Sequence, residues 1–449
     1  MPRNRTKKII IVIYFLGIFN IKLISTKQIL NNLNVIRPKV TNTYKIISII
    51  RFLPIVNGYT RITMFDNLSL RSYFHMFRNF VFNNIGRTSQ RTEGHFLQIP
   101  YSNDDQFPCG LNNSKSATKP NSVHKLRPGD IDVIAAMGDS LTAGTGAAST
   151  KFVDLFMENR GLVWSIGGQY NWRNVTTLPN ILKVFNPKLV GYSRHDSFPF
   201  HLDSQFNVAE IGAVSSDLPF MAKVLVQRIK NDSRVNFEKS WKMVTICMGG
   251  NDFCTFICTM KNPEILPKLH RRNMIKALRY LRDNLPRTFV NVVTEPPPHK
   301  VVLLKTNSKI CKTINHLECS CFVGNLFKQD QKTLERYERI HEKFSQVEEE
   351  VTKLQEFRNL TEFAVVFQPF SRNLSMMADN GKPDYTLLAY DCFHISQKGN
   401  AWVGTTLWNS LLQADGEKEL TWSSPHKKFL CPTKENPYFL TYDNSRSHS

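Results

Sequence analysis

Four short apolar runs, separated by stretches of helical periodicity, constrain the fold of this 449-residue chain more than any other feature. The runs are Ile131–Met137, Trp241–Met248, Phe289–Thr294 and Phe363–Phe367. Each has the length of a buried strand. Strands that alternate with helices imply right-handed β-α-β crossovers and a parallel sheet covered on both faces. We therefore predict the α/β fold class.

The segments between these runs supply the helices that such crossovers need. Leu218–Asn231 carries apolar residues at helical spacing, and so does Leu269–Leu285, which Pro286 ends. The pattern also predicts three further helices and one loop held by cysteines: helices over Thr150–Asn159, Thr333–Phe357 and Ala401–Leu412, and the loop over residues 305–328.

The loops that follow the strands are where chemistry is expected, because parallel sheets bind ligands at the carboxyl ends of their strands. Four such loops begin at Gly138, near Gly212, at Gly249 and after Phe367. The residues that could carry a reaction are therefore sought in these four places.

Ser140 follows the first strand in the sequence Gly-Asp-Ser-Leu. Alone, it has two ordinary explanations, as the N-cap of the next helix or as a turn residue. The G-x-S-x-G nucleophile elbow of α/β-hydrolases does not fit, because Thr142 stands where the second glycine belongs. Asp139 is expected to shape the turn. A nucleophilic serine would also need a base, a group that orients the base, and donors for an oxyanion.

The other loops contain residues of these types. Asp391 and His394, three residues apart, can pair as orienting carboxylate and base. Asn251, in Gly-Gly-Asn-Asp, offers an amide N–H₂, and Gly212 offers a backbone N–H. Each alone also fits a structural role, such as a tight turn or a helix-start aspartate near a surface histidine. Together they lie at strand exits along one edge of one sheet, which favours a common site.

With these four blocks in this order, the chain resembles the GDSL or SGNH hydrolases. That name stands for a serine in Gly-Asp-Ser-Leu, a glycine, an asparagine in Gly-x-Asn-Asp and a histidine in Asp-x-x-His. The matching residues are Ser140, Gly212, Asn251 and His394, with Asp391 as the acid.

One branch of the family, the animal membrane-associated phospholipase B repeats, is similar over about residues 105–445. The stretches that carry this likeness are Val123–Pro128, Gly138–Gly144, Arg160–Leu162 ahead of Trp164–Gly168, Asn174–Pro179, Asp391–His394, Cys431-Pro432 and Tyr442–Ser445. Larger members of that branch carry several tandem repeats, whereas one repeat is visible here.

The resemblance implies a three-layer α/β/α sandwich with a central parallel sheet. It implies a serine ester hydrolase in which Ser140 attacks the ester, His394 acts as general base and then acid, and Asp391 orients His394. The N–H groups of Ser140 and Gly212 and the side chain of Asn251 would form the oxyanion hole. An acyl-enzyme would release fatty acids from phospholipids or lysophospholipids at a membrane surface. The family chemistry implies no metal and no organic cofactor.

Two alternatives remain open at this point. The chain could be a GDSL esterase that acts on small acyl or acetyl esters, with the same catalytic residues and a different acyl pocket. It could also be a lipid-binding or partner-binding pseudoenzyme, since a fold does not guarantee a function. None of the five site residues is missing, which disfavours the second alternative.

The N-terminus has the pattern of a signal peptide or an uncleaved signal anchor. Basic residues 1–8 precede the apolar run Ile9–Ile21, which is short for a membrane span. We assign residues 1–26 to this segment, residues 27–104 to a basic extension of unknown fold, and residues 105–445 to the hydrolase domain. The last residues carry no apolar tail, so a membrane anchor is expected only at the N-terminus. The expected location is the secretory pathway, secreted or membrane-associated and facing outside.

Positive charge is concentrated before the motif-bearing part of the chain. Residues 1–130 hold 19 Lys and Arg against 5 Asp and Glu, whereas residues 131–449 hold 39 against 32. A basic stripe interleaved with aromatic residues, a zinc pattern and a helix-turn-helix are not evident, so no nucleic-acid partner is expected. Attraction to anionic lipid fits the charge equally well. The oligomeric state is left open.

Nine cysteines favour disulfides over a metal framework. The close pairs Cys254/Cys258 and Cys319/Cys321 do not have the spacing of a structural zinc site. With a secretory start, disulfides are expected, and Cys247, inside an apolar strand, is the expected free buried thiol. Six sequons permit N-glycans, at Asn67, Asn112, Asn174, Asn231, Asn359 and Asn373.

Overall fold

The structure is a computed structural model that describes residues 68–91, 94–112, 114–302, 308–323, 330–374 and 382–445. The predicted signal or anchor segment, residues 1–26, lies outside the described residues, and so do residues 27–67 of the predicted extension. Among the helices that are described, none is both long enough and apolar enough to cross a bilayer.

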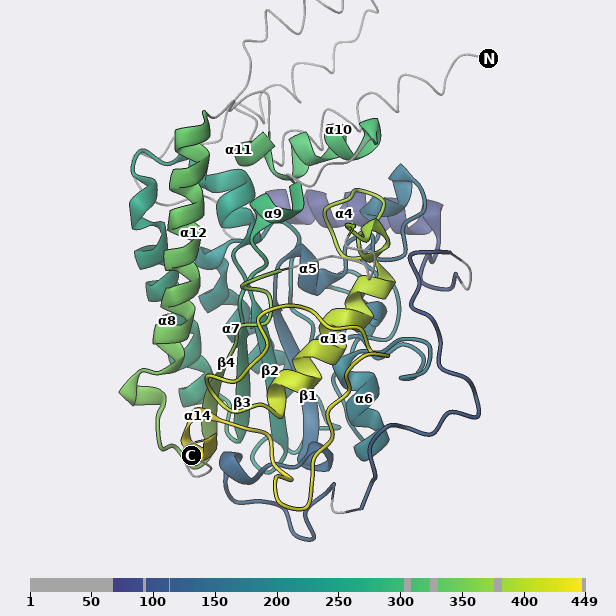
Figure 1. Ribbon diagram of the computed structural model, residues 1–449, viewed down its shortest axis with the longest axis vertical. Helices are drawn as coiled ribbons and strands as arrows, with labels where there is room; N and C mark the ends of the chain where they lie inside the picture. Colours follow the sequence, from purple (N-terminus) through teal and green to yellow (C-terminus); the bar gives the residue numbers. More distant parts are fainter. Residues whose placement is uncertain are drawn as a thin grey trace, which may run out of the picture. The chain divides into compact units, whose positions relative to one another are not determined.

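A four-stranded parallel sheet in the order β1-β2-β3-β4 forms the centre of the fold (Figure 1). The strands are β1 (Ile131–Gly138), β2 (Trp241–Cys247), β3 (Thr288–Val293) and β4 (Phe363–Gln368). Gly138 pairs with Cys247, Cys247 with Val293, and Val293 with Gln368, so the carboxyl ends of all four strands are aligned. The four predicted strands are confirmed.

Helices cover both faces of this sheet. Along β1, Val133 and Ala135 pack into one core cluster, whereas Ile134 and Ala136 pack into another. Successive strand side chains point to opposite faces, so these clusters are the two interfaces of a three-layer α/β/α sandwich, as predicted. The crossover helices are α7 (Leu218–Lys230), α8 (Leu266–Asn284) and α12 (Gln331–Thr352); α6 (Leu178–Phe185) and α13 (Gln397–Leu411) cover the other face.

The remaining described α-helices lie outside these two layers or at their ends (Figure 1). They are α4 (Leu68–Ile85), α5 (Ser140–Ala143), α9 (Pro298–Val302), α10 (Lys309–Glu318), α11 (Ser320–Val323) and α14 (Tyr442–Ser445).

The helix predicted over Thr150–Asn159 is wrong. Only residues 152–156 wind into a short 3₁₀ stretch. Oδ2 of Asp154 accepts hydrogen bonds from the backbone N–H groups of Thr150 and Lys151, and also from Arg91. These bonds cap the start of the stretch. The helix does not continue because Met157 is extended, and its carbonyl oxygen accepts the N–H of Gly146 at 2.8 Å.

The loop predicted over residues 305–328 is also wrong in part, because it contains helices α10 and α11. The Ser308 side chain caps α10 by accepting the N–H of Cys311, and Cys311 and Ile314 lie on its buried face. The cysteines do hold the segment, as expected: all three of them form disulfides.

Eight of the nine cysteines are paired, and Cys247 is free and buried, as predicted. Such a set of disulfides fits folding in an oxidising, extracellular pathway. The pairs are Cys109–Cys431, Cys254–Cys319, Cys258–Cys321 and Cys311–Cys392.

Part of the predicted N-terminal extension contacts the domain that follows it. Arg78 of α4 is buried and forms ion pairs with Glu158 and Glu210. The backbone N–H of Gln98 donates to Gln397 at the start of α13, at 2.5 Å. A buried charge is costly unless it is paired, so these ion pairs fix α4 in place. The domain boundary at residue 105 stays a prediction, and these contacts cross it.

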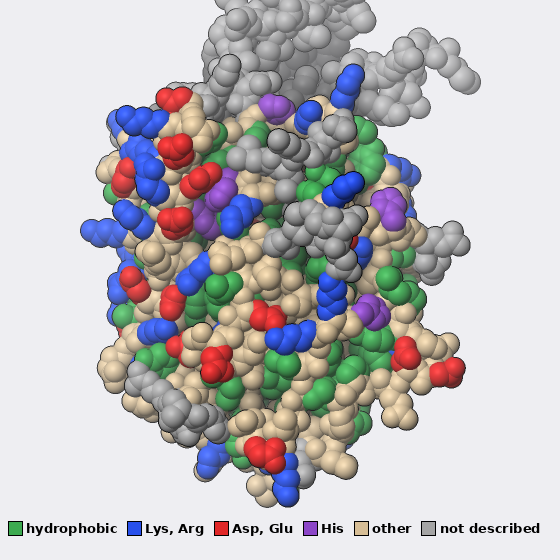
Figure 2. Space-filling model, viewed as in Figure 1, with side chains coloured by type: hydrophobic (Ala, Val, Ile, Leu, Met, Phe, Trp, Pro, Cys, Tyr) green, Lys and Arg blue, Asp and Glu red, His purple; other side chains and the backbone are tan. Residues whose placement is uncertain are grey.

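Charges of both signs are distributed over the face of the molecule seen in Figure 2. Basic and acidic side chains are interspersed there, with scattered apolar ones between them. This distribution agrees with the nearly balanced charge of residues 131–449.

Candidate active site

The turn after β1 places Ser140 at the carboxyl edge of the sheet. A Cβ added to Gly138 would lie 2.5 Å from the carbonyl oxygen of Cys247 and 2.4 Å from Oγ1 of Thr142. The chain can therefore turn this sharply beside β2 only with glycine at position 138.

Asp139, not Ser140, is the N-cap of α5. Its Oδ1 accepts the N–H of Leu141 at 3.0 Å, and the carboxylate also accepts the N–H of Gly249 at the exit of β2. The side chain thus joins two strand exits and shapes the turn, as expected. Burial raises the pKa of Asp139 to about 6, although these N–H groups favour its ionised form. Ser140 occupies the first turn of α5, so its hydroxyl is not needed as the cap.

The loop between β4 and α13 brings a histidine and a carboxylate to Ser140. Nε2 of His394 lies 2.9 Å from Oγ of Ser140, and Nδ1 lies 2.6 Å from Oδ2 of Asp391. All three residues are buried. Oδ1 of Asp391 accepts the backbone N–H groups of Phe393 and His394, each at 2.9 Å, which fixes the carboxylate. The hydrogen-bonded chain from hydroxyl to imidazole to carboxylate is the arrangement of an activated serine.

The charges and hydrogen bonds around His394 favour the protonated form of its imidazole. Burial alone would lower the pKa of His394, but the charge and hydrogen bond of Asp391, with Glu318 and Asp139, raise it to about 9. In its neutral form His394 is therefore a strong base for the Ser140 proton.

The loops that hold Asn251 and Gly212 are joined to each other. Nδ2 of Asn251 donates to the carbonyl oxygen of Ala213 at 3.0 Å, and Oδ2 of Asp252 accepts the N–H of Ser215 at 2.9 Å. Gly212 has a φ of 74°, in the left-handed region that favours glycine. The sequence Gly-Gly-Asn-Asp therefore holds the Gly212 loop.

Asn251 and Ser140 line the same pocket, whereas Gly212 is not among the described residues that line it. A side-chain amide has two N–H groups, so Asn251 retains one that can donate to an oxygen bound at Ser140. The structure thus brings Ser140, His394, Asp391 and Asn251 together, with Gly212 held next to Asn251 through Ala213.

Comparison with known proteins agrees with this geometry. The model of the GDSL-like lipase/acylhydrolase family matches residues 134–407. The chain belongs to this family. It is 38% identical over 337 residues, 74% of the chain, to membrane-associated phospholipase B1 of Homo sapiens, and 36% identical over 338 residues to the protein of the same name from Mus musculus. The predicted resemblance is confirmed. The matches cover 22% of each relative, so the chain spans about a fifth of their length.

Among solved structures, the crystal structure of phospholipase A1 from Streptomyces albidoflavus NA297 aligns over 60% of this chain and 95% of that chain. The two are 12% identical, with a TM-score of 0.28, a likeness too low to carry an argument.

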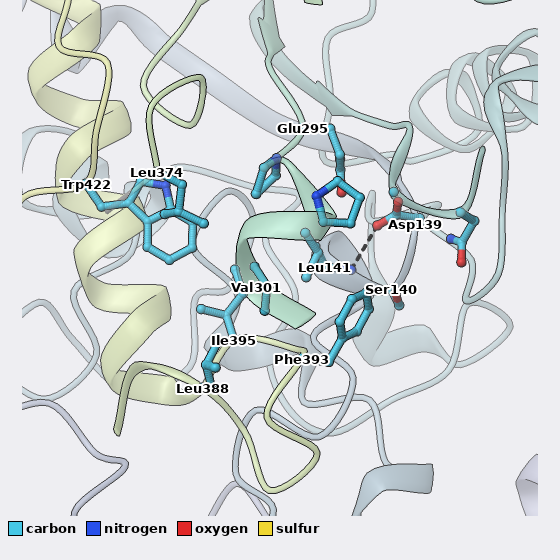
Figure 3. A pocket seen from close by; sticks show the side chains of 14 residues that line it. Asp139, Ser140, Leu141, Glu295, Val301, Leu374, Leu388, Phe393, Ile395 and Trp422 are labelled. Carbon is cyan, nitrogen blue, oxygen red and sulfur yellow. Dashed lines mark hydrogen bonds between the residues drawn. The ribbon is translucent and has the colours of Figure 1, made fainter. Parts of the chain in front are cut away.

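Ser140 of this GDSL-family chain lines a pocket that has a mainly apolar wall (Figure 3). Trp422 lies on one side, and its Nε1 donates to Oγ of Ser371 at 3.0 Å. Pockets of this composition suit an apolar group anchored by a few polar contacts. The apolar lining residues are Leu141, Pro296, Pro298, Val301, Leu374, Leu388, Phe393, Ile395 and Trp422, and the polar ones are Asp139, Ser140, Asn251 and Glu295.

Sequence reasoning missed two acidic residues at this GDSL site. Glu295, just after β3, is 3% exposed and accepts a hydrogen bond from the Cys247 thiol at 3.1 Å. Burial first, and then the Asp139 charge, raise the pKa of Glu295 well above its usual range. Its position directly after an apolar strand could have indicated from the sequence that Glu295 lies at the site. Glu318 of α10 gave no such signal, because its position depends on how the cysteines pair.

Proposed function

We propose that this chain is a serine ester hydrolase of the phospholipase B type, which releases fatty acids from phospholipids and lysophospholipids. The observation that carries the proposal is the hydrogen-bonded chain Ser140–His394–Asp391, whose serine lines a mainly apolar pocket. The identity of 38% to a relative named phospholipase B1 supports the substrate class.

Acylation begins when Oγ of Ser140 attacks the ester carbonyl carbon. Nε2 of His394 takes the hydroxyl proton, and Asp391 stabilises the imidazolium and holds its tautomer. The backbone N–H groups of Ser140 and Gly212 and the amide of Asn251 donate to the oxyanion. His394 then protonates the departing glycerol oxygen, and the acyl group remains on Ser140.

Deacylation repeats these steps with water. His394 takes a proton from the attacking water, and the same donors stabilise the second oxyanion. The fatty acid leaves as His394 returns the proton to Oγ of Ser140. Each step uses groups of the chain and water.

The apolar wall favours long acyl chains over acetyl groups. Each CH₂ group buried against side chains such as Val301, Leu388 and Trp422 contributes about 0.8 kcal/mol to binding. This gain distinguishes the phospholipase proposal from an esterase for small acyl groups.

A phosphatidylcholine with a different acyl chain at each position tests the proposal, alongside lysophosphatidylcholine and short p-nitrophenyl esters. We expect the wild type to release both fatty acids and to prefer the long-chain substrates. Ser140→Ala should lose this activity, while Ser102→Ala, at an exposed serine, should keep it. Turnover confined to short soluble esters would exclude the phospholipase, and wild-type turnover by a folded Ser140→Ala variant would exclude the mechanism.

We also propose that the chain enters the secretory pathway through residues 1–26 and acts on lipid outside the cell. The four disulfides and the membrane-associated relatives support this location. Five of the six predicted glycan sites lie among the described residues, and all five are exposed. Expression in secretory cells should give a mobility shift on glycosidase treatment, and an unshifted intracellular product would contradict the proposal.

A further inference from the structure

Helices α10 and α11 are tied to the site by three disulfides. Cys311 pairs with Cys392, which lies between Asp391 and His394. The other two disulfides, Cys254–Cys319 and Cys258–Cys321, join the segment to the region just after Asn251. The segment lies at the end of the sheet that carries α5 and Ser140 (Figure 1). Two of the loops that build the site are therefore covalently joined to α10 and α11.

This tether brings Glu318 to the imidazole. Glu318 is the last residue of α10, next to the disulfide-bonded Cys319. One of its carboxylate oxygens, one oxygen of Asp391 and one ring nitrogen of His394 all lie within 4.8 Å of one another. A disulfide on α10 and another just after it thus hold a second carboxylate beside the Asp391–His394 pair.

Three acidic groups act on His394, each from a different element. Asp391 comes from the loop before α13, Asp139 from the turn after β1, and Glu318 from α10, and all three favour the protonated imidazole. Burial raises the pKa of Glu318 to about 7, although His394 opposes this shift. Above that pH, Glu318 is an anion beside an imidazole that still holds its proton.

We propose that Glu318 is a positioning residue of the hydrolase, whose carboxylate, held beside His394 by α10, stabilises the imidazolium that forms when Ser140 attacks. The proposal rests on the proposed function. A negative charge within about 4–6 Å favours the charged form of a partner, and here the half-buried Glu318 faces a buried imidazole. Glu318 acts through His394 and touches neither the ester nor the water.

The test is the pH dependence of Ser140 labelling by a fluorophosphonate, a reaction that needs an activated serine and no phospholipid. The labelling rate rises as His394 loses its proton, so its midpoint reports the pKa of His394. Glu318→Gln removes one negative charge and should shift the midpoint down by about 1 pH unit. Glu342→Gln, at an exposed glutamate of α12, removes a matched charge elsewhere and should leave the midpoint in place.

Glu318→Asp provides a second variant if the glutamine variant does not fold. It moves the charge away by one CH₂ group, so the midpoint should shift in the same direction by less. A merely structural role for Glu318 would lower the labelling rate at every pH without moving the midpoint, and that result would overturn the proposal.

The outcomes separate this inference from the proposed function. If Ser140 is labelled with the same midpoint in wild type and Glu318→Gln, the proposed role of Glu318 is wrong and the proposed hydrolase function is unaffected. No labelling of Ser140 at any pH, in wild type or variants, removes both.

Discussion

Two regions of the molecule meet at His394, and they are held there by different forces. The strand-exit loops are fixed by hydrogen bonds to Asp139, Asn251 and Asp391. The α10–α11 segment, residues 309–323, is fixed by three disulfides. In the proposed mechanism the loops carry the groups that contact the reacting atoms, whereas the α10–α11 segment supplies the charge of Glu318. Substitutions in the loops should therefore lower the rate of hydrolysis. Substitutions in the α10–α11 segment should change the stability of the fold and the pH dependence of activity.

Of the substitutions in the two regions, Asp391→Asn should have the largest effect on activity. The amide oxygen can still accept the backbone N–H groups of Phe393 and His394, so the loop should fold. The imidazole loses its anion and its tautomer control, and kcat/KM should fall about 10⁴-fold. Kinetics on lysophosphatidylcholine, with thermal unfolding as the folding control, measure this. A loss of less than tenfold would contradict the role of Asp391.

Asn251→Ala tests the oxyanion donors of the loop region. Removal of one preorganised donor should lower kcat by about 10²–10³-fold, with a smaller change in KM. Asn436→Ala, at an exposed asparagine, is the matched control and should keep wild-type kinetics. An effect on KM alone would mean that Asn251 binds the ground state and the transition state equally.

The double substitution Cys311→Ser with Cys392→Ser tests how much one disulfide of the α10–α11 segment contributes to stability. It opens a disulfide whose cysteines are 81 residues apart, and the free energy of unfolding should fall by about 2–4 kcal/mol. Neither sulfur atom takes part in the Ser140–His394–Asp391 hydrogen bonds, so we expect hydrolysis to persist. Denaturant unfolding and turnover at one temperature give both quantities, and complete loss of turnover in a folded protein would contradict the division of roles.

The smallest expected effect is the change in kcat/KM of the wild type with each pH unit. His394 accepts the Ser140 proton only when neutral, and its pKa is raised to about 9. Hence kcat/KM should increase about tenfold per pH unit below that midpoint and level off above it. A profile that is flat from pH 7 to pH 9 would show that the three acidic groups do not raise the pKa of His394.

The sheet and the pairing of Asp391 with His394 could be predicted from sequence because both rest on local patterns, and the catalytic roles stay a prediction. Each strand is a short apolar run, and Asp391 and His394 are three residues apart. The helix over Thr150–Asn159 could not be predicted correctly, because Met157 is held extended by a backbone hydrogen bond from Gly146, a contact that helical periodicity does not show. The position of Glu318 was out of reach for a different reason. It depends on cysteine pairs 65 and 81 residues apart, and spacing does not determine their connectivity.

The central claim is that Ser140 is the nucleophile that His394 activates. Its most direct test is peptide mapping by mass spectrometry after treatment with a fluorophosphonate. We expect one adduct, on the peptide that contains Ser140, and none in Ser140→Ala. An adduct on another serine, or phospholipid hydrolysis by the wild type without any adduct on Ser140, would contradict the claim.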